Sequence, residues 1–360
     1  MSKKTGDFTG NRGEWSEVYV LFKLLVDKKL QGADQHGNPN PQVMMDVLKV
    51  FRGKLEASVN KNIEIVNAGH RFSFQVTDIN TNVVKLYKAI AKEEGIIKAK
   101  SGAFSVPQIE AFLRGLGCTQ LTSAGTKKRD ITVQIDDCQH GAKPIQGFSI
   151  KSEIGGAPSL LNATKATNLI FELDGLSDKD IKDINSIVTK EKIIDRCNLV
   201  KRLAKNINFD KFNNLTFSEN LRGIDGDLPA IISYFVYAHY FEACSTCEEA
   251  VQWLEKQNPL NFKSTIHYSI KIKRFLRSVA LGMKPASAWY DEDDATGGYI
   301  IAKPNGALVA FFIYDRRLFD NYLMKLTKFE RGSITKHDFM VVYKQGNKFF
   351  VKLNLQIRFT

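Results

Sequence analysis

Two short segments near the middle of the chain alternate apolar and polar residues, and they constrain the fold most strongly. The first runs over residues 129–135 and the second over residues 147–153. A period of two is typical of strands that bury one face. Asp130 lies near the start of the first segment and Lys151 near the end of the second. The pattern therefore predicts an acid and a lysine held side by side on a sheet.

Such a pair suits metal-dependent cleavage of a phosphodiester bond. That reaction uses a divalent cation to neutralise developing charge and to acidify the attacking water. Mg²⁺ prefers carboxylates, backbone carbonyls and water as ligands. We expect Asp130 to bind the metal, the backbone carbonyl of Ile150 to complete its shell, and Lys151 to position or activate the water or to stabilise the phosphate charge.

The spacing of Asp130 and Lys151 resembles the PD-(D/E)xK nucleases, with one departure. Ser149 stands two residues before the lysine, where that pattern has an acid. Ser149 is kept as a catalytic candidate, but a second carboxylate must come from elsewhere. The candidates are Glu17, which we favour, then Glu14, and also Glu153 and Glu172.

The first two of these acids are three residues apart on an expected amphipathic helix from about Glu14 to Leu30, so they project from one helix face. Their alternative role is a favourable interaction of two acids with the helix dipole. Glu153 shares the strand side of Lys151 but lies beyond the regular end of the strand. Glu172 is expected on a helix that follows.

The rest of the chain predicts a mixed α/β protein in three parts. Residues 1–175 form a mixed-sheet, PD-(D/E)xK-like nuclease core, residues 176–285 a helical region, and residues 286–360 a β-rich region that contacts DNA. Helical signals cover residues 178–190, 192–205, 228–242, 247–256 and 264–281. Hairpin signals cover residues 63–76, 299–312 around Asn305-Gly306, and 339–353.

Charge and the lack of long apolar runs narrow the function. The chain has 51 Lys and Arg against 39 Asp and Glu, a net charge of +12. Such a surplus favours a polyanionic partner, because cations placed near phosphates release counterions. No apolar run reaches the ~20 residues of a membrane span, and no apolar signal segment opens the chain. We therefore expect a cytoplasmic protein without a membrane partner.

Three groups of residues, taken together, resemble the HpaII-type type II restriction endonucleases. They are residues 10–17 (GNRGEWSE), residues 148–152 (FSIKS) with 159–164 (SLLNAT) and Thr167-Asn168, and residues 353–359 (LNLQIRF). The likeness touches both ends and the centre of the chain. It implies Mg²⁺-dependent cleavage of a short double-stranded DNA sequence, with a methyltransferase that protects host DNA. HpaII itself is associated with CCGG, which makes CCGG the candidate target.

The residues that contact DNA are less clearly marked than the catalytic ones. Asn162, Lys165 and Asn168 follow the second strand and are candidates for reading bases, although capping and turn hydrogen bonds explain such residues equally well. A palindromic target would favour a two-fold homodimer. The rival functions are a repair or recombination nuclease of the same superfamily, and a basic nucleic-acid-binding protein without activity.

Overall fold

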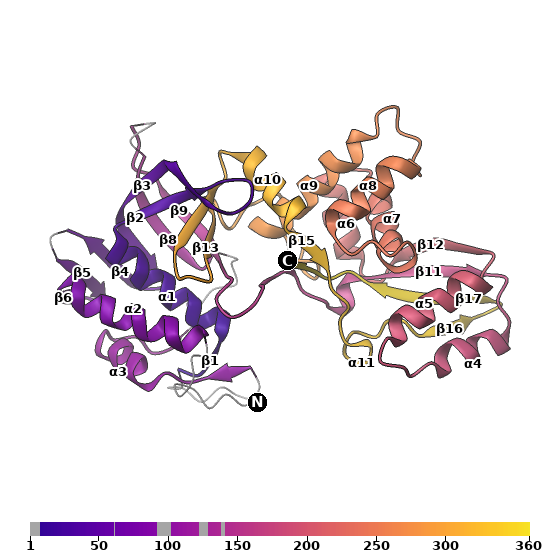
Figure 1. Cartoon of the computed structure of the whole chain (residues 1–360), viewed down its shortest axis with the longest axis horizontal. Helices are drawn as coiled ribbons and strands as arrows, with labels where there is room; N and C mark the ends of the chain where they lie inside the picture. Colours follow the sequence, from indigo (N-terminus) through magenta and orange to yellow (C-terminus); the bar gives the residue numbers. More distant parts are fainter. Residues whose placement is uncertain (1–7, 61, 92–101, 122–128, 138–140) are drawn as a thin grey trace. The chain divides into compact units, whose positions relative to one another are not determined.

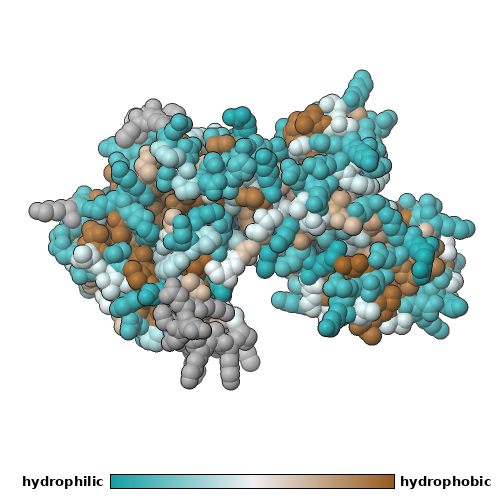
Figure 2. Space-filling view, viewed as in Figure 1, coloured by the Kyte–Doolittle hydropathy of each residue, from teal (hydrophilic) through white to brown (hydrophobic). Residues whose placement is uncertain are grey.

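The chain folds into two compact units, described separately here. The computed structural model describes residues 8–60, 62–91, 102–121, 129–137 and 141–360. The first unit comprises residues 1–158 and 293–319, and the second comprises residues 159–292 and 320–360. Hydrophilic residues cover most of the face shown in Figure 2. Within the described ranges, no helix is long and apolar enough to cross a membrane.

The first unit is built on a large mixed sheet with the order β2-β14-β13-β9-β8-β3-β4-β5-β6. An additional pairing of β2 with β3 closes six of these strands into a ring. Most neighbours are antiparallel, but β13 runs parallel to β9 and β14 runs parallel to β2. The strands are β2 (Lys29–Ala33), β3 (Pro39–Arg52), β4 (Leu55–Val59), β5 (Ile63–Asn67), β6 (His70–Phe74), β8 (Ile131–Asp136), β9 (Ile145–Ser152), β13 (Gly298–Ala302) and β14 (Leu308–Phe312).

Helix α1 (Arg12–Asp27) is the core element of this unit. It packs beside α2 (Val76–Ala91), and α3 (Pro107–Gly115) follows (Figure 1). Trp15, Tyr19 and Phe22 on α1 are almost fully buried and join the apolar face of the sheet. The Trp15 indole donates to the carbonyl of Phe104 in β7 (Ala103–Phe104), which pairs with β1 (Gly10–Asn11). Burial of these rings fixes α1 against the sheet.

The end of α1 corrects the sequence prediction, which carried the helix to Leu30. Lys28 adopts a left-handed backbone (φ 56°) and its N–H caps the carbonyl of Leu24. The chain then enters β2, where Leu30 is buried and pairs with Met45. The apolar residues of β2 continue the helical spacing of α1, so the sequence pattern did not show where the helix ends. A left-handed cap at a lysine also lacks the glycine that often marks a helix end.

The second unit combines two smaller sheets with a group of helices. Its four-stranded sheet has the order β12-β11-β17-β16 and its three-stranded sheet the order β10-β18-β15. The strands are β10 (Ser159–Leu161), β11 (Asn168–Asp174), β12 (Asn206–Phe212), β15 (Thr327–Phe329), β16 (Val342–Gln345), β17 (Lys348–Asn354) and β18 (Ile357–Phe359). The helices are η1 (Lys165–Thr167), α4 (Asp178–Ser186), α5 (Lys192–Leu203), α6 (Leu215–Ile224), α7 (Leu228–Phe241), α8 (Cys247–Gln257), α9 (Ile266–Leu281) and α11 (Ile334–His337). Helix α10 (Arg316–Lys325) begins in the first unit and ends in the second.

The mixed α/β class is confirmed, and so are the central strand pair, the hairpin around Asn305-Gly306 and the five expected helices of the middle region, most of them within a few residues. The two units group the chain differently from the expected three parts. Strands β13 and β14 join the sheet of the first unit, whereas β17 pairs with β11 of the second. Such pairings between distant segments leave no local trace in the sequence.

Gly298 is a position where the sheet tolerates no side chain. Its φ is +113°, and an added Cβ would lie 2.0 Å from the carbonyl oxygen of Phe311. We expect Gly298→Ala to lower the free energy of unfolding by about 3 kcal/mol or more, measured by urea denaturation. Gly346→Ala is the control, since its φ of +61° has open space around it and the cost should stay near 1 kcal/mol. Equal stabilities of the two variants would contradict this prediction.

Candidate active site

Asp130 lies immediately before β8, where β9 continues past the end of its neighbour. Its N–H donates to the carbonyl of Phe148 at 2.9 Å, which extends the ladder by one residue. Its Oδ2 accepts from the N–H of Ile150 at 2.6 Å and from the Ser149 hydroxyl at 3.2 Å. Among the described residues, two groups donate hydrogen bonds to this carboxylate, and both bonds end on Oδ2. The group is therefore fixed in orientation, and its other oxygen is left for another partner.

Lys151 follows on β9, beside Ile301 of β13. Its Nζ lies 5.6 Å from the centroid of the Tyr299 ring, within the range of a cation–π interaction. Burial lowers the pKa of this ammonium, whereas the charges of Asp130 and Glu17 raise it. The net shift is downward, which brings Lys151 closer to releasing a proton near neutral pH.

Glu17 reaches the same place from α1. Its Oε2 lies 2.9 Å from the guanidinium of Arg52 at the end of β3, and its side chain is 18% exposed. Burial raises the pKa of Glu17 to about 7; the Arg52 charge opposes this rise, and the Asp130 charge adds to it. Burial likewise raises the pKa of Asp130, against the opposing effect of Lys151. Two acids and a lysine thus interact electrostatically at one site.

The other acids that the sequence offered are engaged elsewhere. Glu14 forms a capping box with Asn11: the Asn11 N–H donates to Oε2 of Glu14 at 2.7 Å. Glu153 pairs with Lys303 at 2.7 Å. Glu172 lies on strand β11 of the second unit, not on a helix as expected, and pairs with Lys348 at 2.8 Å. The strand replaces the helix because Leu169, Phe171 and Leu173 alternate into the core of that sheet.

The candidates for DNA contact fall into two classes. Asn162 and Lys165 are exposed. Asn168 is fully buried: its amide donates to the carbonyls of His337 and Asp338, and its carbonyl accepts from Asn354. This network joins β11 to β17 and to α11, so Asn168 has a structural role here and presents no surface to a base.

Arg52 is a site residue that sequence reasoning missed. Its side chain is 8% exposed, and its guanidinium donates both to Glu17 and to the carbonyl of Leu121 at 2.5 Å. A buried carboxylate needs a cationic partner, but among 51 lysines and arginines no local pattern marked this one. Tyr299 was missed for a similar reason, because it reaches Lys151 only through the pairing of β13 with β9.

Arg52→Gln is expected to change the pH profile of the enzyme. Loss of the guanidinium removes the charge that lowers the pKa of Glu17, so the rise in cleavage rate with pH should move upward by roughly one unit. At neutral pH the rate should fall by about 10-fold or more, with partial recovery in alkaline buffer. Arg71→Gln is the control, since Arg71 is 74% exposed and its contact with Glu64 is 3.8 Å. An unchanged profile in Arg52→Gln would refute the assignment.

The raised pKa of Glu17 also predicts how stability depends on pH in the metal-free protein. Between pH 4.5 and about 7 the folded state holds a proton that the unfolded state releases, so stability falls as pH rises through this window. The loss is complete above the folded pKa and amounts to at most about 3 kcal/mol. Urea midpoints of the protein and of Glu17→Gln, compared at acidic and alkaline pH, measure it. Parallel pH dependences of the two would contradict the prediction.

Comparison with known proteins identifies the family to which the chain belongs. The family model described as HpaII restriction endonuclease matches residues 11–359. The chain is 37% identical over 363 residues to "Type II restriction enzyme HpaII" from Haemophilus parainfluenzae, and the alignment covers 98% of this chain and 99% of that protein. No solved structure matches the chain. The resemblance found in the sequence is thereby confirmed: the chain belongs to the HpaII restriction endonuclease family and is a type II site-specific endonuclease.

Proposed function

We propose that this enzyme hydrolyses double-stranded DNA at the sequence CCGG, with Mg²⁺, in a centre of the PD-(D/E)xK type. The observation that carries the proposal is the meeting of Asp130, Lys151 and Glu17, which lie just before β8, on β9 and on α1. The net charge of +12 supports a polyanionic substrate. The relative from Haemophilus parainfluenzae is named as a restriction enzyme, and that kinship supports the choice of target.

The donor set fits a magnesium ion that keeps part of its water shell. Asp130 and Glu17 offer carboxylates, and the backbone of Ile150 faces Asp130 through its N–H. The N–H and C=O of one strand residue point to the same edge, so the Ile150 carbonyl is also directed there. Among the described residues no cluster of three or more His, Cys, Asp or Glu side chains could hold a metal. Two carboxylates, a carbonyl and waters remain a normal set for Mg²⁺.

The residues divide the chemical work between them. A bound Mg²⁺ would supply positive charge against the charge that develops on the phosphate. Lys151 orients the attacking water and accepts its proton when deprotonated, a role that its lowered pKa favours. The water oxygen bonds to phosphorus, the bond to the leaving oxygen breaks, and that oxygen takes up a proton. Ser149 holds the Asp130 carboxylate, and Arg52 holds Glu17.

Two partners belong to the same proposal. CCGG reads identically on both strands, so a two-fold homodimer would present one active site to each strand. A cognate methyltransferase would modify the same sequence in host DNA. Asn162 and Lys165 are exposed and stay our candidates for DNA contact. The C-terminal segment adds the basic residues Arg316, Arg317, Lys325, Lys328, Arg331 and Lys336 for contacts to the phosphate backbone.

Plasmid digestion with Mg²⁺, followed by sequencing of the cut ends, tests the proposal. We expect discrete fragments whose ends all fall within CCGG, and no cutting in EDTA. Pre-methylation of CCGG should protect the plasmid. Ends at another fixed sequence would reject the target but keep the chemistry. Cleavage confined to branched or damaged DNA would favour a repair nuclease, and binding without any cutting would leave a non-catalytic DNA-binding protein.

A further inference from the structure

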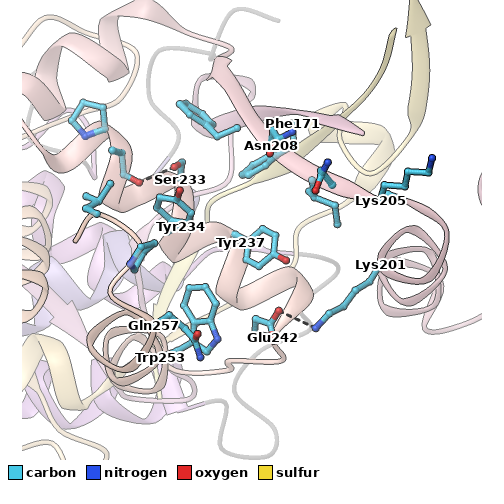
Figure 3. A pocket seen from close by; sticks show the side chains of 18 of the residues that line it. Phe171, Lys201, Lys205, Asn208, Ser233, Tyr234, Tyr237, Glu242, Trp253 and Gln257 are labelled. Carbon is cyan, nitrogen blue, oxygen red and sulfur yellow. Dashed lines mark hydrogen bonds and ion pairs between the residues drawn. The ribbon is translucent and has the colours of Figure 1, made fainter. Parts of the chain in front are cut away.

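The second unit contains a cavity that the cleavage chemistry does not use. It has a volume of about 1040 Å³ and lies between β11 and β12, the C-terminal part of α5, and helices α7 and α8 (Figure 3). Every residue that lines it falls within residues 171–260, inside the second unit, whereas Asp130, Lys151 and Glu17 belong to the first. The volume is that of a site for a small organic ligand.

One wall of the cavity is aromatic. Tyr234 and Tyr237 lie one turn apart on α7 and are partly exposed, although most of that helix is buried. The ring of Tyr237 lies 5.9 Å from that of Trp253 on α8, at an interplanar angle of 31°. Figure 3 shows both rings at the cavity. Partly exposed aromatic faces of this kind offer stacking surfaces to a planar ligand.

The cavity is also lined by charged residues, most of them basic. Its charged lining consists of three cations, Lys201, Lys205 and Arg222, and one acid, Glu242. Lys201 pairs with Glu242 at 2.9 Å, which cancels one charge of each sign. Among the described residues, Arg222 forms one ion pair, with the exposed Glu219 at 3.4 Å, and such a surface pair contributes little. Lys205 is exposed, and no ion pair joins it to the described residues. Two positive charges thus remain for an anion.

Amides complete the lining. The Asn208 amide donates to Asp174 at 3.0 Å, which orients the side chain, and Gln257 is exposed at the mouth near Trp253. Aromatic faces, free positive charge and amide donors and acceptors together match a heteroaromatic base that carries a phosphate. A purely apolar ligand would leave the cations and amides unused, and a simple anion would leave the rings unused.

We propose that this cavity binds a nucleotide, with the base stacked against Tyr237 and Trp253 and the phosphate near Lys205. Stacking of a base on an aromatic side chain contributes about 1–3 kcal/mol. Two sources share this chemistry: a free mononucleotide, and a nucleotide turned out of a DNA strand. The site is a second point of nucleotide recognition, independent of the residues that cleave.

Titration of the full-length, metal-free protein with deoxynucleoside monophosphates tests the site. Tryptophan fluorescence should change on binding, and Trp253→Phe should lose most of that change. Deoxycytidine, which lacks the phosphate, should bind at least ~10-fold more weakly than dCMP. Tyr237→Leu keeps the apolar volume but removes the ring, and should weaken dCMP binding by roughly 5- to 100-fold. Lys205→Ala should weaken dCMP but not deoxycytidine.

Lys211→Ala is the matched control, because Lys211 is an exposed lysine on β12 that pairs with Asp210 and does not line the cavity. Far-UV circular dichroism checks that each variant is folded. A target duplex that carries 2-aminopurine separates the two sources. If 2-aminopurine fluorescence rises on binding and Tyr237→Leu abolishes the rise, the cavity binds a nucleotide turned out of DNA. Binding of monophosphates without that rise assigns a free nucleotide.

Two results would overturn the proposal. One is the lack of both monophosphate binding up to ~1 mM and a 2-aminopurine response. The other is binding that survives in Tyr237→Leu and in Lys205→Ala alike, since the nucleotide would then lie elsewhere. The cleavage proposal is tested separately, because the Asp130 and Lys151 variants leave this cavity intact.

Discussion

Asp130→Asn and Lys151→Met are each expected to reduce DNA cleavage by ~10³-fold or more while the protein stays folded. Asparagine keeps an oxygen that accepts from the Ile150 N–H and the Ser149 hydroxyl, but it removes the negative charge available to Mg²⁺. Methionine keeps the length of the lysine beside Tyr299 and removes its proton-carrying nitrogen. Rates from a plasmid-nicking assay measure the loss.

Each variant has a control in the same unit. Asp136→Asn changes an acid at the far end of β8, where it pairs with Lys143 at 3.0 Å, and Lys303→Met breaks the partly buried pair with Glu153. Both controls should cut within about 3-fold of the parent. DNA affinity in Ca²⁺ should change little in any of the four. Near-parental cleavage by Asp130→Asn or Lys151→Met would rule out the assigned centre.

Glu17→Gln is expected to reduce cleavage by about 10²- to 10³-fold. Glutamine keeps a hydrogen-bond acceptor for Arg52 at 2.9 Å, so the fold is preserved, but it cannot supply the second negative charge to the metal. The Mg²⁺ concentration needed for half-maximal rate should rise, because metal affinity depends on the charge of the ligands. A titration of rate against Mg²⁺ measures both effects.

The comparison with the other acids decides which one completes the site. Glu153→Gln should cost less than about 3-fold, since it breaks only the pair with Lys303. Glu14→Gln should weaken the capping box of α1 and reduce stability by about 0.5–1 kcal/mol, with little effect on rate. Loss of activity in Glu153→Gln together with an active Glu17→Gln would move the second acid to the end of β9.

The sequence predicted the centre of the site better than its surroundings. Alternation located β8 and β9 to within two residues, because each strand has one buried face that sets its period. A local signal also predicted the hairpin of β13 and β14, since the Asn305-Gly306 pair is typical of a tight turn between two strands. The proximity of Asp130 and Lys151 was predictable because β8 and β9 are close in the sequence and pair with each other.

Contacts between residues far apart in the sequence were not predictable from local sequence patterns. The contact of Glu17 with Arg52 joins α1 to β3, and the contact of Lys151 with Tyr299 joins residues almost 150 positions apart. Asn168 was a candidate for contact with DNA because it is a polar residue that follows β9. In the structure its side-chain amide instead donates to the carbonyls of His337 and Asp338. Spacing alone does not distinguish a polar side chain that faces solvent from one that closes a buried network.

The discontinuity of the first unit has a consequence for biosynthesis. Strand β9 carries Lys151, and its parallel neighbour β13 begins only at Gly298, after most of the second unit has been made. A nascent chain that ends at Glu292 lacks β13 and β14 and leaves one edge of β9 unpaired. The first unit therefore completes its sheet late in translation, through a strand pairing of high sequence separation, a kind of contact that is expected to form slowly. A chain of this length contains Asp130, Lys151 and Glu17 but lacks Tyr299 beside Lys151, so we expect the proposed centre to reach its final form only after β13 has been made.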